Sequence, residues 1–154
     1  MNQKELNEIL DLHKKWVNND GGQRAILSGV DLSYVDFSNA DLSGADLSNA
    51  NFTNANLTNA NFYRTSLTNA VLTNVYLRNC VGNSTNIKTL FIFDEYNISY
   101  TKDLLQIGCE LHKIEEWWCF DNNMILEMDG KEALKFWRKN KETIKEIIKN
   151  NPAY

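Results

Sequence analysis

The chain has 154 residues, which suits one compact unit or a small repeat domain with an appendage. Its net charge of −4 and sequence pI near 5.2 exclude the basic surface that nucleic-acid-binding proteins use. No apolar run approaches the length of about 18 residues that a membrane-spanning helix needs. We therefore expect neither direct nucleic-acid binding nor a membrane segment.

The cysteines and the first residues indicate the cellular compartment. Cys80, Cys109 and Cys119 are too few, and odd in number, for a disulfide framework. Residues 1–12 carry four charged side chains where a signal peptide would have its apolar core. Both features favour a reduced, cytoplasmic protein.

Residues 3–18 are predicted to form an amphipathic helix, because apolar residues recur with helical spacing. One face of this helix would carry Leu6, Ile9, Leu10, His13 and Val17. Gly21 and Gly22 then provide a stop signal. We expect the apolar face to cover one end of the structure that follows, with His13 as a packing residue and not a ligand.

A five-residue repeat dominates the next segment. From Leu27 to Leu77 every fifth residue is Leu or Phe, and a small residue, most often Ala, lies two positions before each. A period of five fits neither a helix nor an ordinary strand. A fixed repeat of this kind predicts a solenoid, in which each unit covers its neighbour.

The unit pattern A-[DN]-[LF]-[ST]-[NG] over residues 22–81 resembles the pentapeptide-repeat family. The resemblance implies a right-handed quadrilateral β-helix with one unit per side, so that residues 20 apart are neighbours in successive coils. The fold expected is mainly β: about three coils (residues 22–86), an N-terminal capping helix (residues 1–21) and a small α+β C-terminal module (residues 87–154). The cap and the C-terminal module resemble those of small phage and prophage members of the family.

The last units of the repeat depart from the pattern at five positions, of which Val71 and Tyr76 face outward. The departing residues, called the late-repeat residues below, are Tyr63, Arg64, Val71, Tyr76 and Arg78. Outward apolar side chains require a cover. We expect residues 83–154 to fold back over them; the alternative is a surface for a protein partner or for a homodimer.

Four aspartates, Asp31, Asp36, Asp41 and Asp46, occupy the outward position on successive sides. They form a ring around one end and not a stripe along the coils. Members of the family that inhibit DNA gyrase are thought to imitate duplex DNA with a long acidic rod. Three coils spaced about 4.8 Å apart are much shorter than one turn of DNA, which is about 34 Å.

The C-terminal module is predicted to be mixed. We expect strands at residues 90–93, 98–100 and 104–109, with a turn at 94–97, and short helices at 114–118 and 121–128. A last helix is predicted to begin at Asp129, which with Glu132 resembles a capping box, and to end near residue 150.

Several residues of this module could carry chemistry. His112, Trp117, Trp118 and Trp137 belong to an aromatic-rich stretch that predicts either a small core or a stacking pocket for a nucleotide-like ligand. Cys109, His112 and Cys119 provide only three metal ligands and no second knuckle, so no metal site is expected. Cys109 and His112 lack an orienting acid or amide, so no catalytic pair is expected either.

These observations predict a non-enzymatic binding or scaffold protein without a cofactor, which acts through protein–protein interaction. Two alternatives remain open. One is sequestration of a small, nucleotide-like ligand by the aromatic stretch. The other is inhibition of a topoisomerase such as DNA gyrase by DNA mimicry, which would need end-to-end dimers.

Overall fold

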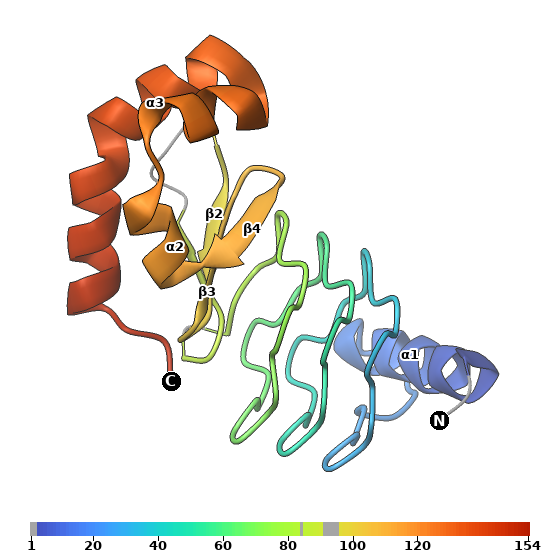
Figure 1. Ribbon diagram of the computed structural model, residues 1–154. Helices are drawn as coiled ribbons and strands as arrows, with labels where there is room; N and C mark the ends of the chain where they lie inside the picture. Colours follow the sequence, from blue (N-terminus) through green and yellow to red (C-terminus); the bar gives the residue numbers. More distant parts are fainter. Residues whose placement is uncertain (1–2, 84, 91–95) are drawn as a thin grey trace.

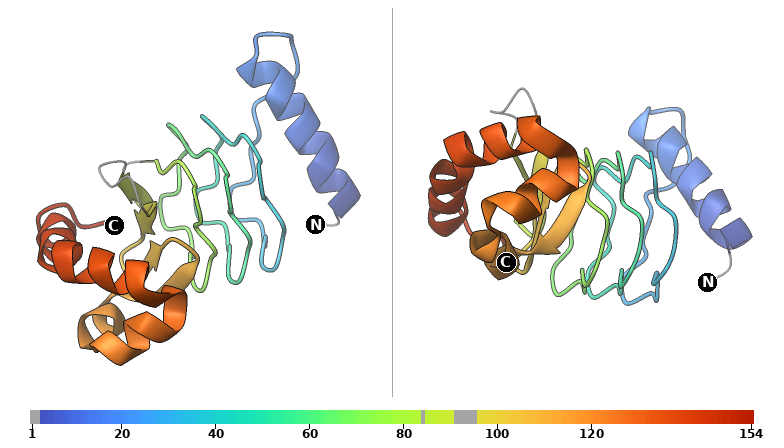
Figure 2. Two further views of the ribbon diagram at one scale, coloured as in Figure 1. Left: turned by 90° about the horizontal axis from the view of Figure 1, so that it is seen from above. Right: turned by 45° about the horizontal axis from the view of Figure 1, so that its top comes forward.

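The structure is a computed structural model that describes residues 3–83, 85–90 and 96–154. Helix α1 (Gln3–Val17) lies across one end of a stack of coils, and a sheet of four strands lies at the other end (Figure 1). Helices α2 (Ile114–Cys119) and α3 (Asn122–Asn150) lie on the side of the sheet that faces away from the coils (Figure 2). The chain therefore runs from a helical end, through the coils, to an α+β end.

The coils stack through backbone hydrogen bonds between residues 20 apart. All eight bridges outside the sheet are parallel and join such pairs, for example Asp31 with Asn51 and Asn51 with Val71. The Leu32 N–H donates to the Asn51 carbonyl oxygen at 2.8 Å, and the Asn51 N–H donates back to Val30 at 3.0 Å. The predicted spacing of 20 residues between neighbours is therefore confirmed.

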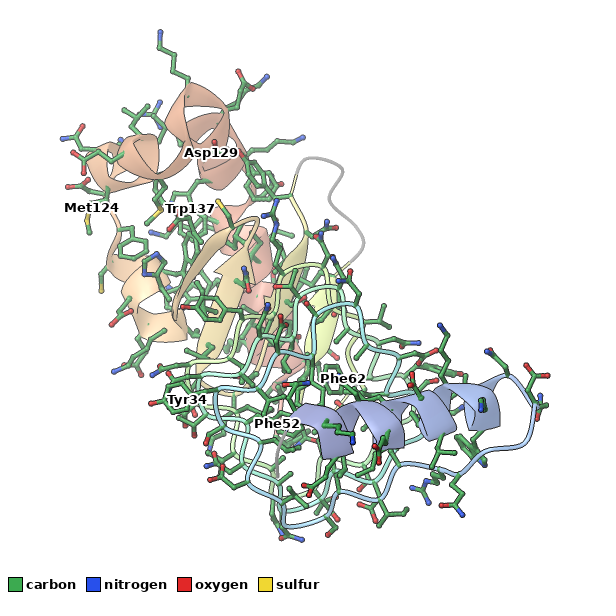
Figure 3. All side chains as sticks on the ribbon, turned by 90° about the vertical axis from the view of Figure 1, so that its right-hand side faces the viewer. Tyr34, Phe52, Phe62, Met124, Asp129 and Trp137 are labelled. Atoms are coloured by element: carbon green, nitrogen blue, oxygen red, sulfur yellow. The ribbon has the colours of Figure 1, made fainter. Side chains whose placement is uncertain are left out.

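The repeated Leu and Phe side chains fill the inside of the coils. Leu32, Leu42, Leu47, Phe52, Leu57, Phe62 and Leu77 are completely inaccessible to solvent. Phe52 contacts Phe37 in one direction and Phe62 in the other, with ring centroids 5.6 and 6.5 Å apart. Figure 3 shows Phe52 and Phe62 inside the stack and Tyr34 on its outer surface. Burial of each such side chain stabilises the fold by about 1.5–3 kcal/mol before entropy is counted.

The polar residues of the repeat form hydrogen bonds within and between coils, and the corner residues adopt a special backbone conformation. The Asp36 carboxylate accepts hydrogen bonds from the Ser38 N–H at 2.9 Å and from the Asn56 amide of the next coil at 3.0 Å. The bond from Ser38 lowers the pKa of Asp36. At each corner one residue adopts a left-handed conformation, which Asn and Gly tolerate best. Tyr34 and Arg64 occupy two of these corners, with φ of 60° and 57°.

Helix α1 covers the first coil as the sequence predicts. Leu6 and His13 are buried, and Ile9 and Leu10 pack against the same core. The His13 Nδ1 accepts a hydrogen bond from the Ala25 N–H at 3.1 Å, and its ring stacks on Trp16. A side chain at Gly22 would collide with the Leu12 carbonyl oxygen, so the close return of the chain requires glycine there.

The sheet consists of strands β1 (Lys88–Leu90), β2 (Ile98–Tyr100), β3 (Leu104–Ile107) and β4 (Glu110–Lys113), paired antiparallel in chain order. The strand predicted at 98–100 is confirmed. The strand predicted at 104–109 ends at Ile107, because Gly108 adopts a left-handed turn conformation. The turn leads into β4, which begins at Glu110 and which the sequence analysis missed. Residues 91–93 of the first predicted strand, and 94–95 of the turn, lie outside the described residues.

The last two predicted helices are joined in the structure. Helix α3 runs through residues 122–150, with its N-cap at Asp121 and a kink at Asp129 and Gly130. The prediction of a separate last helix is confirmed, although that helix begins after Gly130, because the backbone of both Asp129 and Gly130 is not helical. The Asp129 carboxylate accepts a hydrogen bond from the Tyr96 hydroxyl at 2.8 Å. This bond connects the kink in α3 to the segment that precedes β2.

A buried glutamine joins the sheet to the last coil (residues 62–81). Between coils the Leu57 N–H donates to the Tyr76 carbonyl oxygen at 2.9 Å. The equivalent N–H of Leu77 donates to the Gln106 Oε1 at 2.6 Å, while the Gln106 Nε2 donates to the Gly108 carbonyl oxygen at 3.2 Å. Gln106 therefore substitutes for the carbonyl group that a further coil would supply.

His13 makes the attachment of α1 dependent on pH. Its pKa is lowered from 6.5, chiefly because burial disfavours the charged imidazole. The folded state thus binds fewer protons than the unfolded state near this pH. We expect the free energy of unfolding to have its full value above about pH 6.5 and to fall as the pH drops through 6.5 toward the lowered pKa.

Urea unfolding between pH 7.5 and pH 5 measures this effect. The experiment is best made with His112→Gln, which leaves His13 as the one titrating imidazole. A further His13→Gln change should flatten the profile. A profile that is equally steep with and without His13 would contradict the assignment.

The role of Gln106 can be tested by Gln106→Met, which keeps the approximate length of the side chain and removes its polar atoms. We expect a loss of about 1–3 kcal/mol in the free energy of unfolding, because the Leu77 N–H is left buried without its acceptor. Gln23→Met, at an exposed position, is the matched control and should change little. Equal effects of the two variants in urea unfolding would refute the capping role.

Candidate functional site

The late-repeat residues remain on the surface. Tyr63, Val71 and Tyr76 expose 52%, 44% and 55% of their area, respectively. The prediction that residues 83–154 fold back over them is wrong. The reason is geometric. The C-terminal part, residues 87–154, packs against the end of the stack and covers the open core there, but it does not extend along the sides of the coils (Figure 1).

The structure does not bring all late-repeat residues together. Tyr63 and Arg64 lie at one corner of the stack, next to α1. Val71 lies on a different side and lines a groove with Thr101 and Lys102. Tyr76 and Arg78 follow on the side centred on Leu77. The predicted surface is therefore three separate places on the molecule, and only the first combines several of its residues with other parts of the chain.

That corner contains a groove, called the corner groove below. It has a volume of about 530 Å³ and is lined by the end of α1 and by two neighbouring coils, with Trp16, Ser43, Gly44, Tyr63 and Arg64 among its residues. The Arg64 guanidinium lies over the Tyr63 ring at 5.0 Å. Trp16, which is 40% exposed, approaches Gly44 so closely that a side chain there would come within 3.2 Å of its ring.

Trp16 is a member of this site that the sequence analysis missed. It lies within the predicted capping helix, one residue before Val17, and is not on the apolar face that packs on the first coil. The available signal was Gly44, a glycine at a corner where the repeat most often has asparagine. A missing side chain at such a corner leaves room for a ring from another segment.

Tyr63 also borders a second groove on its other side. Val81, Lys88 and Ile147 are among the residues that line this space of about 380 Å³. Tyr63 therefore projects between two grooves, one bounded by α1 and the other by the C-terminal part. Tyr, Trp and Arg are the residues most enriched among those that dominate binding at protein interfaces.

The four predicted ligand-binding residues come together, but as a core. Trp117 and Trp137 are 3% and 4% exposed and pack against each other, with ring centroids 5.3 Å apart. Trp118 stacks on Trp137, and His112 meets the edge of Trp117. The Trp117 Nε1 donates to the Leu105 carbonyl oxygen at 2.7 Å.

The space left inside this cluster is about 30 Å³, bordered by Trp117, Trp137, Tyr96 and Asp129. This is the volume of about one water molecule, whereas ligand sites occupy about 300–1,000 Å³. A nucleotide does not fit without separation of the aromatic rings. The ligand-binding role of these four residues stays a prediction that this geometry does not favour.

The cysteines carry no evident chemistry. Cys80 is buried, and burial raises the pKa of its thiol to about 11, so the reactive thiolate is disfavoured. Cys109 and Cys119 are exposed. Within residues 3–83, 85–90 and 96–154, no three His, Cys, Asp or Glu side chains are grouped so that they could hold a metal ion.

The aspartate ring does not extend along the coils. The next outward residues after Asp31, Asp36 and Asp41 are Asn51, Asn56 and Asn61, whose amides donate to those carboxylates at 3.0–3.1 Å. The coil after that has Val71, Tyr76 and Val81 at the same positions. The outer surface thus changes from acidic to amide to apolar along the stack, unlike an acidic rod.

In the described part of the chain, no helix combines the length and apolar character needed to cross a membrane. This finding agrees with the absence of a long apolar run in the sequence.

Comparison with known proteins identifies the repeat. The family model for pentapeptide repeats matches in eight copies, over residues 25–64, 45–81 and 60–88. The comparison with curated proteins finds no significant match.

Among solved structures, the pentapeptide repeat protein Rfr23 from the cyanobacterium Cyanothece 51142 is 30% identical over 36% of this chain and 39% of its own, with a TM-score of 0.35. HetL, a pentapeptide repeat protein involved in heterocyst differentiation regulation from the cyanobacterium Nostoc sp. strain PCC 7120, is 32% identical over 39% of this chain and 31% of its own, with a TM-score of 0.24.

The chain thus matches 39% and 31% of the lengths of these two proteins. The coils formed by residues 25–88 are therefore pentapeptide repeats.

Proposed function

We propose that this chain is a non-enzymatic binding protein that docks another protein on the outside of its coils, with the corner groove as the anchor point. The observation that carries the proposal is the exposure of Tyr63 beside Trp16 and Arg64, on a surface that the chain itself leaves uncovered. In this proposal residues 22–86 supply a rigid surface, while residues 1–21 and 87–154 close its ends.

The rigidity of the scaffold supports this role. Tyr63 follows Phe62, which is completely buried. The Phe62 N–H donates a hydrogen bond to the Val81 carbonyl oxygen at 2.7 Å. The Tyr63 N–H itself donates to the Asn61 side chain at 3.0 Å. Because the backbone on which Tyr63 is mounted is held from both sides, a partner that binds there has little backbone entropy to remove.

Arg64 supports the proposal through its backbone. It is an arginine at a corner position that requires a positive φ of 57°, where the corners before and after it in the repeat, Asn59 and Asn69, are asparagines. Residues other than glycine, asparagine and aspartate are strained in this conformation, and such strain is often retained where function requires the side chain. At Arg64 the guanidinium is available to a carboxylate while its flat face lies on Tyr63.

The groove also indicates the chemistry of the partner. Trp16 and Tyr63 offer apolar ring surface, while Arg64 and the neighbouring Arg24, which donates to the Gly44 carbonyl oxygen at 2.7 Å, supply positive charge. We propose a partner that places an apolar side chain between the two rings and a carboxylate near the arginines. A second copy of this chain is the alternative occupant.

Site-specific photocrosslinking tests the proposal. Benzoylphenylalanine in place of Tyr63 should give a discrete crosslinked species in cells that naturally make the protein. Tyr34, which is 78% exposed on the same stack, is the matched control position and should give none. The species should disappear when excess unlabelled protein competes, but not when the competitor carries Trp16→Ala and Arg64→Glu.

The mass of the crosslinked species distinguishes a different protein from a second copy of this chain, and light scattering of the purified protein checks the latter. Identical crosslinking at positions 63 and 34 would reject the corner groove as the anchor.

Replacement of the strained corner residues separates stability from binding. Arg64→Asn and Tyr34→Asn should each raise the free energy of unfolding by about 1 kcal/mol, because asparagine tolerates the left-handed corner. Only Arg64→Asn should also reduce the yield of the crosslinked species. Urea unfolding and the crosslinking assay measure the two effects, and an undiminished yield with Arg64→Asn would exclude a binding role for Arg64.

A further inference from the structure

The coils bond to each other in a fixed pattern on the side centred on Leu32, Phe52 and Leu72. The central residue donates its N–H to the next coil, as Phe52 does to Val71 at 2.8 Å. The residue two positions later donates in the same direction, as Asn54 does to Thr73 at 2.9 Å. The small residue accepts in return, as Ala50 does from Val71 at 2.9 Å.

In the last coil the same groups have no partner. The N–H groups of Leu72 and Asn74 and the carbonyl group of Ala70 point to where a further coil would lie, and within the described residues nothing bonds to them. We call these three groups the open edge. Ala70 and Leu72 are half-buried, and Asn74 is exposed.

The neighbouring parts of the last coil are closed by side chains. The Leu77 N–H is bonded to Gln106, the Thr65 carbonyl oxygen accepts from Asn83 at 3.2 Å, and the Cys80 carbonyl oxygen accepts from Thr89 at 2.8 Å. The C-terminal part thus caps the coil on both sides of the open edge but leaves the edge itself uncovered.

A groove of about 390 Å³ lies along the open edge. One wall is the coil itself, from Asn69 to Thr73, and the other consists of Thr101, Lys102 and Asp103 with Tyr154 at one end. In Figure 1 the end of the chain lies beside the last coil, below the strands. The volume of the groove is in the range of sites that hold small ligands and short peptide segments.

The geometry points to a binding site for an extended peptide segment of another protein, which adds to the open edge as a parallel strand in the place of a fourth coil. Unpaired N–H and C=O groups at strand spacing are complementary to one kind of ligand, an extended backbone. The inward side chain of that segment would stack on Leu72 and its outward neighbour on Val71, so an aliphatic residue is favoured at the first position. This site is separate from the corner groove, and neither proposal depends on the other.

The pattern between coils also determines which peptide groups bind. In the bound segment the outward residue would donate its N–H to Ala70 and accept from Leu72, and the residue two positions later would accept from Asn74. The N–H of the inward residue would point away from the protein, as the Leu72 N–H does now. In the bound segment the N–H group of the outward residue therefore bonds to the protein, whereas the N–H group of the inward residue, the next in sequence, does not.

The test uses an end-blocked peptide Asn-Ala-Asn-Leu-Thr-Asn, which copies residues 54–59 of the chain. Its third residue is the outward one and its fourth the inward one. Amide hydrogen exchange and NMR titration of the full-length protein are the measurements. We expect the Leu72 and Asn74 amides to exchange fast in the free protein and to become protected as peptide is added.

Two N-methylated peptides are the matched controls. Methylation of the third residue should weaken binding about tenfold, because it removes the donor to Ala70. Methylation of the fourth residue should leave binding nearly unchanged. The proposal is overturned by any of three results: protected Leu72 and Asn74 amides in the free protein, no protection at saturating peptide, or equal binding of the two methylated peptides.

A fourth result would also overturn it. If protection of Leu72 and Asn74 increases with protein concentration in the absence of peptide, the edge is occupied by a second copy of this chain. None of these outcomes bears on the crosslinking at Tyr63, so failure of one proposal is distinguishable from failure of the other.

Discussion

The hydrogen bonds between residues 20 apart are the constraint on which the rest of this structure depends. They hold each coil on the previous one, and they place every Leu and Phe of the repeat above another apolar side chain. The same stacking aligns Asp, Asn and Ser or Thr on the outside, where amide and carboxylate groups bond from coil to coil. A regular interior and an ordered exterior thus have one common cause.

A stack of this kind leaves two open ends, and the chain closes them differently. Helix α1 lies across the first coil, with Leu6 and His13 buried beneath it. The other end meets a sheet whose faces alternate: Ser99, Leu104 and Gln106 belong to the coil side, whereas Ile98, Tyr100, Leu105 and Ile107 pack beneath α2 and α3. Because an antiparallel sheet cannot continue the parallel coil pattern, individual side chains substitute for the missing carbonyl and N–H groups. Among the described residues, none provides such a substitute on the side of the last coil centred on Leu72.

The distribution of aromatic residues follows from this arrangement. The tryptophans of residues 117–137 are used to hold α2 and α3 on the sheet, and the cavity that remains is only water-sized. Trp16, on the outer surface of α1, and Tyr63, on the side of the stack, are in contrast partly exposed. The two binding sites proposed above therefore lie on a side and at the uncovered edge of the coils, whereas the packed interior of the C-terminal module contributes stability.

The sequence by itself determined that residues 22–81 form a solenoid, since their five-residue period fits neither a helix nor an ordinary strand, and the resemblance to the pentapeptide-repeat family implied its four-sided coils. It also determined α1, from the helical spacing of its apolar residues. Only the tertiary structure decided that Val71 and Tyr76 stay exposed, that Trp16 joins Tyr63, that β4 follows the turn at Gly108, and that the Asp129 carboxylate bonds to Tyr96. The physical reason is that each of these features depends on groups far apart in the chain, such as Leu77 and Gln106, whose meeting no local pattern records.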